Sequence, residues 1–356
     1  MDITSKSVRG RGAQSNAVGR FERHGREAVD DGWDIVEDLP PLRTEVTDEV
    51  PRRVITRNTS PDISFDRSIN PYRGCEHGCV YCFARPSHAY LGLSPGLDFE
   101  TKLIARPQAP RVLEAELRRA SYRCDVIAIG TNTDAYQPIE KERRVMRGVL
   151  EVLQGFRHPV AIATKGTLIE RDLDILSEMG QAGLAHVGIS VTTLQPDLSR
   201  KMEPRVPSPA RRLRTIEALS RAGVPVRVMI SPIVPGLSDH ELEAIVDAAR
   251  DAGAVAASMI PLRLPREVSA LWQDWLAENY PERVGRVMSK LRDMHGGKDY
   301  EAEFGKRMRG EGLWAKLLQQ RFTRAVRAAG LTEHLPSLRT DLFEVPFATG
   351  DQLALF

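Results

Sequence analysis

The 356-residue sequence is poor in cysteine, in net charge and in long apolar runs. Its four cysteines are unlike the disulfide framework of a small secreted protein. Three of them fall between positions 75 and 82, which in a reducing compartment indicates a metal or cluster site. The formal net charge of +2 is too small to attract nucleic acid to the whole molecule, so any such binding must depend on local patches.

Membrane and secretion signals are also missing. No apolar run approaches the roughly 18 residues that span a bilayer, and the polar start of the chain lacks the apolar segment of a secretory signal. We therefore expect a cytoplasmic protein without a membrane partner. The hydrophobic content of 42% is that of a globular protein with a sizeable core, and one α/β barrel of about 250 residues with extensions accounts for the length.

From residue 65 onward, short β-branched runs alternate with amphipathic stretches, which predicts parallel strands joined by crossover helices. The expected strands are 65–70, 125–130, 160–164, 186–191, 226–231 and 254–260. The expected helices are 110–121, 141–154, 170–182, 209–222 and 238–252. This pattern favours an α/β fold, a partial (β/α)6 TIM-like barrel; a doubly wound open sheet is the alternative, because strand order cannot be read from one sequence.

The pattern divides the chain into four parts. Residues 1–60 have little apolar periodicity and are expected to form a flexible N-terminal arm. The partial barrel is assigned to 61–265, a helical C-terminal extension to 266–340, and an exposed tail to 341–356. Small or polar residues follow several strands, and in a β/α barrel these positions meet at one face. They are 130–134, 164–166, 190–193 and 231–232.

The central motif places Cys75, Cys79 and Cys82 in a C-x3-C-x2-C pattern on a glycine-punctuated loop. Three thiolates in this arrangement can wrap one face of a cuboidal iron–sulfur cluster and leave the fourth iron without a protein ligand. One alternative is a zinc site that uses these cysteines with His77 or His88. Another is an electron-transfer protein, for which Cys124 is the only candidate fourth ligand. Cys124 is otherwise a small buried residue.

The motif, with Tyr81 directly before the last cysteine, resembles the signature of the radical S-adenosylmethionine (SAM) superfamily. The resemblance implies an oxygen-sensitive enzyme with a [4Fe–4S] cluster whose open iron chelates SAM. Cleavage of SAM to a 5′-deoxyadenosyl radical then drives hydrogen abstraction, while the protein supplies placement and excludes water. It also implies a reductase, or a flavodoxin- or ferredoxin-type protein, as electron donor.

Between about residues 65 and 265 the chain is similar to the spore photoproduct lyase and DNA repair photolyase-like group. The similarity rests on the segments NPYRGCEHGCVYC, GTNTDAYQPIE, ATKGTLIERD and MEPRVPSP. It implies that Lys165 pairs with the SAM carboxylate and that Ser190 binds the same moiety, although Lys165 also fits an ordinary exposed lysine. The further cofactor-binding candidates are Tyr81, Thr131, Asn132, Asp134 and Arg205, of which Asn132 and Asp134 also suit helix capping. Tyr136 and Glu203 are further pocket candidates. No catalytic residue is assigned beyond the candidates Tyr136 and Cys124.

One departure from this group concerns the substrate. The lyase uses a cysteine near the end of its second barrel strand as a hydrogen donor, whereas residues 128–134 here read Ala-Ile-Gly-Thr-Asn-Thr-Asp. The residues that the resemblance assigns to radical generation are present, but without this cysteine spore photoproduct itself is not the expected substrate.

Two features suggest a nucleic-acid context. Residues 305–327 are rich in lysine and arginine, with Trp314 and Phe322 between them, and such a patch can neutralise phosphates and stack bases. It equally fits the solvated side of an amphipathic helix. The last five residues, from Gln352 to Phe356, resemble the peptide that docks repair proteins on the bacterial DNA sliding clamp. The alternative is an apolar terminus packed on its own domain.

These observations support a radical SAM enzyme that acts on nucleic acid, in DNA repair or modification with lyase-like chemistry. A first alternative keeps the chemistry and assigns a peptide or a small molecule as substrate. A second alternative is a non-enzymatic zinc-binding or clamp-associated adaptor.

Overall fold

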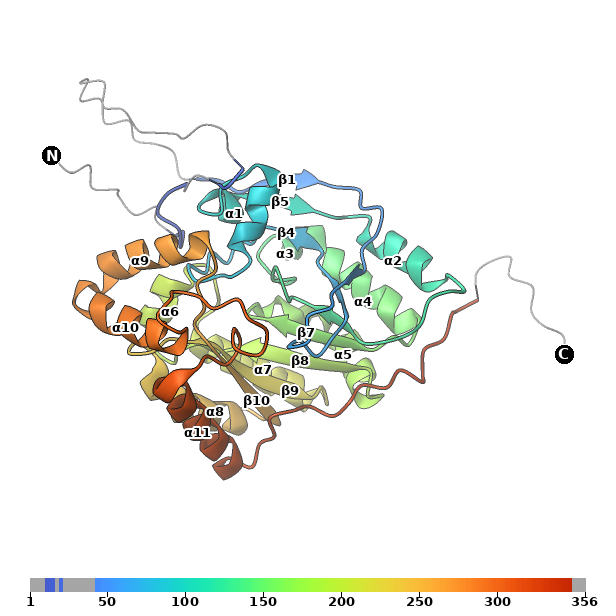
Figure 1. Ribbon diagram of the computed structural model, residues 1–356. Helices are drawn as coiled ribbons and strands as arrows, with labels where there is room; N and C mark the ends of the chain where they lie inside the picture. The colour runs from blue at the N-terminus through green and yellow to red at the C-terminus, as the bar shows by residue number, and fades with distance from the viewer. Residues whose placement is uncertain (1–9, 17–18, 22–41, 348–356) are drawn as a thin grey trace, which may run out of the picture.

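The computed structural model describes residues 10–16, 19–21 and 42–347 (Figure 1). The tail motif from Gln352 to Phe356 therefore lies outside the described residues, as does part of the expected N-terminal arm.

The main sheet has seven strands in the order β10-β9-β8-β7-β6-β3-β2. The two-residue β2 (Thr56–Arg57) pairs antiparallel with its neighbour, and the other six strands are parallel and follow chain order without reversal. These six are β3 (Arg67–Ile69), β6 (Ile127–Ile129), β7 (Val160–Thr164), β8 (Ala185–Ser190), β9 (Val226–Ile233) and β10 (Ala256–Pro261). A doubly wound sheet requires a reversal of strand order, so the prediction of a partial six-unit barrel is confirmed and its alternative is wrong.

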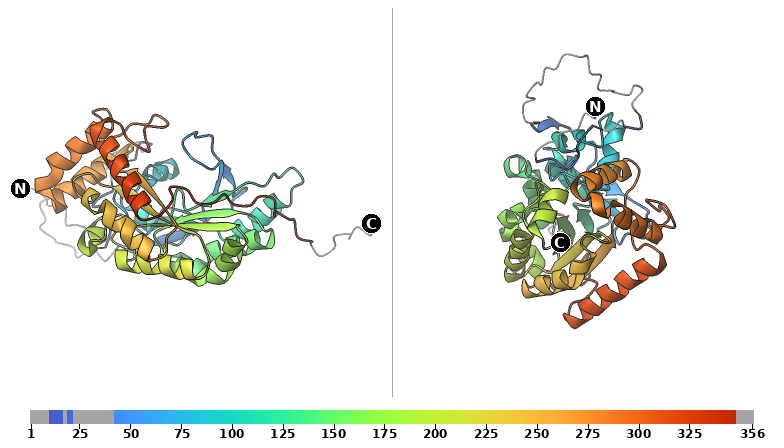
Figure 2. Two further views of the ribbon diagram at one scale, coloured as in Figure 1. Left: turned by 90° about the horizontal axis from the view of Figure 1, so that it is seen from below. Right: turned by 90° about the vertical axis from the view of Figure 1, so that its left-hand side faces the viewer.

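Helices cover one face of this sheet (Figure 2). They are α2 (Ala109–Leu117), α3 (Glu140–Arg143), α4 (Val145–Gly155), α5 (Leu173–Gln181), α7 (Pro209–Arg221) and α8 (Leu242–Asp251), with the 3₁₀ turns η2 (Thr167–Asp172) and η3 (Asp239–Glu241). In α4, the side chains of Met146, Val149, Leu150 and Leu153 are buried at the spacing of one helix face. The buried faces of these helices therefore pack on the sheet and form much of the main hydrophobic core.

The other face of the sheet is lined by smaller side chains. Along β7, Val160, Ile162 and Thr164 are buried, and Ala161 and Ala163 point to the opposite side. On β8, a Cβ at Gly188 would lie 2.7 Å from the sulfur of Met229 on β9. Small residues on this face leave room for a pocket at the carboxyl ends of the strands.

A smaller sheet stands beside the main one. It joins β1 (Glu45–Asp48), β5 (Lys102–Ala105) and β4 (Tyr72–Arg73), with the 3₁₀ helix η1 (Arg85–Leu91) and α1 (Asp98–Thr101) next to it. β1 and β2 both belong to the segment that we expected to be a flexible arm, so this part of the arm is structured instead. The reason is long-range pairing: β1 is parallel to β5, and the Val54 and Ile55 amides donate to Glu116.

The C-terminal part of the chain contributes α9 (Glu267–Asn279), η4 (Pro281–Arg283), α10 (Val284–Met294) and α11 (Gly312–Ala328). Helices α9 and α10, together with α6 (Pro196–Met202), form a second apolar cluster around the stacked rings of Trp272 and Trp275, whereas the buried side chains of α11 belong to the main core. This cluster includes Val80 and Tyr81 of the cysteine loop. Helices α9 and α10 therefore support that loop.

After α11 the chain crosses the amino ends of the strands. The amides of Thr332, Arg339 and Glu344 donate to backbone carbonyls that precede β10, β8 and β7, and Phe343 packs against Phe156. Residues 341–347 of the expected exposed tail are therefore attached to the barrel, because these amides and rings find partners there. In the described part of the chain, no helix is long and apolar enough to cross a membrane.

Candidate active site

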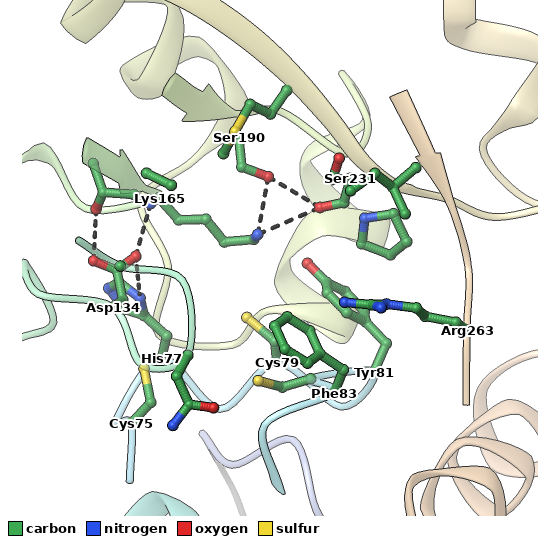
Figure 3. A pocket seen from close by; sticks show the side chains of 18 of the residues that line it. Cys75, His77, Cys79, Tyr81, Phe83, Asp134, Lys165, Ser190, Ser231 and Arg263 are labelled. Carbon is green, nitrogen blue, oxygen red and sulfur yellow. Dashed lines mark hydrogen bonds and ion pairs between the residues drawn. The ribbon is translucent and has the colours of Figure 1, made fainter. Parts of the chain in front are cut away.

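A pocket lies at the carboxyl ends of the main-sheet strands (Figure 3). The cysteine loop forms one side, and residues at or just after the carboxyl ends of β6, β7, β8, β9 and β10 form the others. From the cysteine loop it is lined by Cys75, His77, Cys79, Tyr81, Cys82 and Phe83; from the strands it is lined by Gly130, Asn132, Asp134, Ala163, Thr164, Lys165, Ser190, Met229, Ser231, Pro232, Ile260, Pro261, Leu262 and Arg263. The expected convergence of the strand ends is confirmed.

The loop that carries the cysteines is held by backbone hydrogen bonds on both sides. The Cys75 amide donates to the Phe99 carbonyl (2.9 Å), and the Val80 amide donates to the Met202 carbonyl (3.0 Å). The turns between the cysteines need a left-handed backbone at Gly78 (φ +67°), which favours glycine. The loop is therefore fixed to α1, next to the small sheet, at one end and to α6 at the other.

The three thiols suit a group larger than one ion. Among the residues that the structure describes, no three His, Cys, Asp or Glu side chains come close enough to hold a single metal ion. Cys75, Cys79 and Cys82 instead border one shared pocket, as three ligands of a cuboidal cluster must. Burial raises the pKa of all three thiols. A positively charged iron centre offsets this cost of forming thiolates, so the donor set fits the cluster.

Asp134 organises the side of the pocket next to Cys75. Its carboxylate accepts hydrogen bonds from the Thr164 hydroxyl (2.6 Å) and the Lys165 amide (2.8 Å), and it lies 3.3 Å from the Nδ1 atom of His77. Burial alone would raise the pKa of Asp134, but the charge and hydrogen bond of His77 and the other two donors lower it to about 2. Asp134 is therefore an anion that joins the cysteine loop to the end of β7.

Lys165 presents a positive charge on the opposite side. Its Nζ atom donates to the Ser190 hydroxyl (2.9 Å) and lies 3.5 Å from the Ser231 carbonyl oxygen. It also stands 5.7 Å from the ring centroid of Tyr81. Within the described chain, no carboxylate lies at ion-pair distance from this ammonium group. The site therefore offers an unneutralised cation beside a hydroxyl group, a pairing that suits a carboxylate ligand.

Tyr81 is anchored behind the pocket by a buried carboxylate. Its hydroxyl donates a hydrogen bond to Glu203, which also accepts from Thr192 (3.0 Å) and pairs with Arg212 (2.8 Å). Burial would raise the pKa of Glu203, but the Arg212 guanidinium and the other neighbours lower it. Glu203 therefore supports the loop from behind and does not line the pocket.

Besides Glu203, four of the predicted residues are not brought to the pocket. Gly130, Asn132 and Asp134 line it, and Thr131 does not. The Tyr136 hydroxyl donates to the buried Asp172 (3.1 Å). Arg205 pairs with Glu76 (3.4 Å), and Cys124 precedes β6 at the amino end of the sheet. The cofactor contacts of Thr131 and Arg205 and the catalytic roles of Tyr136 and Cys124 are therefore not supported.

The pocket also contains residues that the sequence did not predict to bind the cofactor or the substrate. The guanidinium carbon of Arg263 lies 4.4 Å from the ring centroid of Phe83, and within the described residues it has no carboxylate partner. Arg263 lies two residues after the end of β10, so a search for polar residues near strand ends, which selected Ser231 of β9, would also have found it. Phe83 and Met229 carry no such signal. His77 had been considered only as a zinc ligand.

A second group of basic residues lies away from this pocket. A groove between η3, α10 and α11 is lined by Gly236, Asp239, His240, Arg283, Arg286, Lys290, Trp314 and Arg321. The Lys290 ammonium stands 3.5 Å from the ring centroid of Trp314 and reaches Asp239 only at 4.0 Å, and Arg286 has no carboxylate partner in the described chain. The groove therefore holds two cations that are poorly neutralised.

The predicted basic segment 305–327 contains both paired basic side chains and buried apolar side chains. Lys306, Arg307 and Arg321 pair with carboxylates of the chain itself. Leu318, Phe322 and Val326 are buried, as the amphipathic alternative expects, but Leu313 is 81% exposed, because it lies on the other side of α11.

The fold and the pocket together define a class of protein. The six parallel strands follow chain order and form a partial barrel. A loop at their carboxyl ends carries three cysteines that border the pocket, an arrangement that suits an iron–sulfur cluster and its ligand.

The chain belongs to the radical SAM superfamily, whose family model matches residues 69–249. It is therefore an enzyme that uses a [4Fe–4S] cluster and SAM, and not the non-enzymatic adaptor considered above. An uncharacterised protein of Mycobacterium tuberculosis is 38% identical over 232 residues, 65% of this chain and 68% of that protein. An uncharacterised protein of Methanocaldococcus jannaschii is 26% identical over 222 residues, 62% and 79% of the two chains.

Solved structures agree on the fold. A spore photoproduct lyase variant matches with a TM-score of 0.59 at 15% identity over 82% of both chains. Another variant, with bound AdoMet and dinucleoside spore photoproduct, matches with a TM-score of 0.58 at 14% identity over 82% of both chains. At this identity the likeness concerns the fold alone.

Proposed function

We propose that Cys75, Cys79 and Cys82 hold the cluster, that Lys165 and Ser190 bind the amino-acid part of SAM, and that the substrate is a nucleic acid. The observation that carries this proposal is the shared pocket, in which three thiols face an unneutralised ammonium group and a hydroxyl. When bound, the cluster and SAM supply an electron and a radical that removes hydrogen from the substrate.

The protein's own residues position these groups. Lys165 attracts the SAM carboxylate, because a charge-assisted hydrogen bond gains strength in a pocket that is shielded from water. Asp134 fixes the backbone of Lys165 and holds His77 of the cysteine loop. Asn132 faces the same pocket and supplies amide groups to SAM or to the substrate. The apolar walls formed by Phe83, Met229 and Leu262 exclude water from the reacting atoms.

Two observations support a nucleic acid as the substrate. Solved structures of spore photoproduct lyase, which share the fold, contain a dinucleoside substrate. In addition, the groove between α10 and α11 presents Arg286 and Lys290 next to an aromatic ring, and such a surface suits phosphates and bases. We infer a role in DNA repair or modification. Spore photoproduct itself is not proposed, since the strand end from Ala128 to Asp134 has no cysteine hydrogen donor.

The test is hydrogen transfer from the polymer. Anaerobically reconstituted protein is given reductant, SAM and deuterated DNA, and the 5′-deoxyadenosine released is analysed for deuterium. Deuterium in this product, lost in a Lys165→Met variant, supports the proposal. Release of 5′-deoxyadenosine without deuterium from DNA, but with deuterium from a peptide or a small molecule, would instead establish the alternative substrate class.

Two partners complete the proposal. A reductase, or a flavodoxin- or ferredoxin-type protein, supplies the electron. The segment from Gln352 to Phe356 docks on the DNA sliding clamp, and the path of residues 331–347 along the amino ends of the strands supports this, because it leads away from the pocket. Deleting residues 352–356 should abolish clamp binding in calorimetry and leave 5′-deoxyadenosine release unchanged. Clamp binding by the shortened chain would contradict the docking proposal.

A further inference from the structure

A short stretch near the start of the chain, residues 10–16, lies against the outer side of the cysteine loop. The Gly12 and Ala13 amides donate to the carboxylate of Glu100 (3.0 and 2.8 Å), and the Ser15 carbonyl accepts from the Leu97 amide (3.2 Å). Ala13 is 2% exposed, so the stretch is packed into the molecule. Nothing in the radical chemistry itself calls for this contact, and its two hydrogen bonds to Glu100 join residues that are 88 and 87 positions apart.

The contact is tight at one point. A Cβ atom at Gly12 would stand 1.7 Å from the carbonyl oxygen of Gly78, which directly precedes the second cysteine of the motif. No side chain fits in that space without displacing one of the two backbones. Gly12 is therefore required for residues 10–16 to rest directly on the loop between Cys75 and Cys79.

Glu100 connects this stretch to the cysteines. Its side chain is fully buried and also pairs with Arg85 (2.5 Å), whose Nε atom donates to the Cys79 carbonyl (3.0 Å). Next to Glu100, the Phe99 carbonyl accepts from the Cys75 amide. One carboxylate therefore holds residues 10–16 on one side and, through Arg85, the second cysteine on the other.

We propose that residues 10–16 belong to the cluster-binding unit, and that Gly12 and Glu100 are positioning residues that fix the cysteine loop and cover its outer side against oxygen. The inference rests on the proposed function only in that Cys75, Cys79 and Cys82 hold the cluster. Displacing the stretch removes two hydrogen bonds to a buried carboxylate and leaves the barrel core in place. The loop then opens locally, which exposes the cluster while the fold persists.

The experiment compares Gly12→Val and Glu100→Gln with a matched control, Gly155→Val, in the full-length chain. Gly155 lies at the exposed end of α4, and its added Cβ meets no atom within 4 Å. The variants are reconstituted anaerobically, their iron and sulfide contents are measured, and the decay of the visible cluster absorbance in air is followed. Hydrogen exchange of the amides between Cys75 and Cys82 is measured on the same proteins.

We expect both variants to lose the cluster in air about tenfold faster than the control, because each loses at least one hydrogen bond to the buried Glu100 carboxylate group. Exchange of the loop amides should rise by a similar factor, while that of β7, β8 and β9 should not change. Wild-type rates of cluster loss and of loop exchange in Glu100→Gln would overturn the inference, whether or not Gly12→Val folds.

This failure differs from a failure of the proposed function. If wild-type protein binds no cluster, or if Cys75→Ala retains it, then the ligand assignment is wrong. If the wild type holds the cluster through the three cysteines and the variants are as stable in air as the control, then only the role of residues 10–16 is wrong.

Discussion

The buried carboxylate behind the cysteine loop gives the sharpest prediction on stability. Glu203 and Arg212 are both fully buried and lie 2.8 Å apart, and Glu203 also accepts hydrogen bonds from Tyr81 and Thr192. Glu203→Gln keeps the shape of the side chain but removes its charge. Arg212 is then left as a buried cation without a counterion.

Breaking a buried ion pair by removing one partner costs about 3–5 kcal/mol of unfolding free energy. Arg212 still donates to the Ser190 carbonyl (2.8 Å) and to the Ser199 hydroxyl (2.9 Å), so we expect a value near the lower end, about 3 kcal/mol. The matched control is Glu217→Gln, which breaks an exposed pair with Arg221 and should cost less than about 0.5 kcal/mol.

The assay is urea denaturation of the cluster-free chain under reducing conditions at pH 7. The lowered pKa of Glu203 means that its contribution is present above its ordinary pKa and is lost as the pH falls through the lower folded value. The difference between wild type and Glu203→Gln should therefore shrink in acid. A destabilisation below about 1 kcal/mol at pH 7, or a difference that grows in acid, would refute the reasoning.

Three further predictions concern the pocket, the core and the groove. Lys165→Met should weaken SAM binding by about 10- to 100-fold in calorimetry, because it removes a charge-assisted hydrogen bond; unchanged affinity would contradict the assigned role. Burial lowers the pKa of His158 to about 4, so stability should fall by about 3 kcal/mol as the pH drops from 6.5 towards 4, and His158→Phe should reduce this slope in denaturation curves. Replacing Arg286 and Lys290 together by alanine should lower the salt dependence of DNA binding by about two phosphate contacts; an unchanged slope would exclude the groove.

Much of the barrel was predictable because its signals are local. Most of the six parallel strands appear as short apolar runs, although β3 does not, and Lys165, Ser190 and Ser231 lie at or next to the carboxyl ends of strands that a parallel sheet brings together. The role of Thr131 stays a prediction, although Thr131 is not among the residues that line the pocket. The domain boundaries at residues 60, 265 and 340 stay predictions.

Long-range contacts explain what the sequence did not reveal. The role of residues 10–16 depends on Glu100, and no local periodicity connects a polar stretch to a carboxylate so far along the chain. β1 was missed for the same reason, because its four residues form a strand only through pairing with β5. The partner of Tyr81 is Glu203, 122 positions away, and only the folded chain brings the two together.

The central claim is that three cysteines hold a cluster with one corner open to SAM. Electron paramagnetic resonance of the reduced, reconstituted protein before and after addition of SAM tests it most directly. We predict a single [4Fe–4S] signal that shifts when SAM is added, that persists in Cys124→Ala, and that is lost in Cys75→Ala, Cys79→Ala and Cys82→Ala. A signal that SAM leaves unchanged, or one that survives removal of any of these three thiols, would contradict the account.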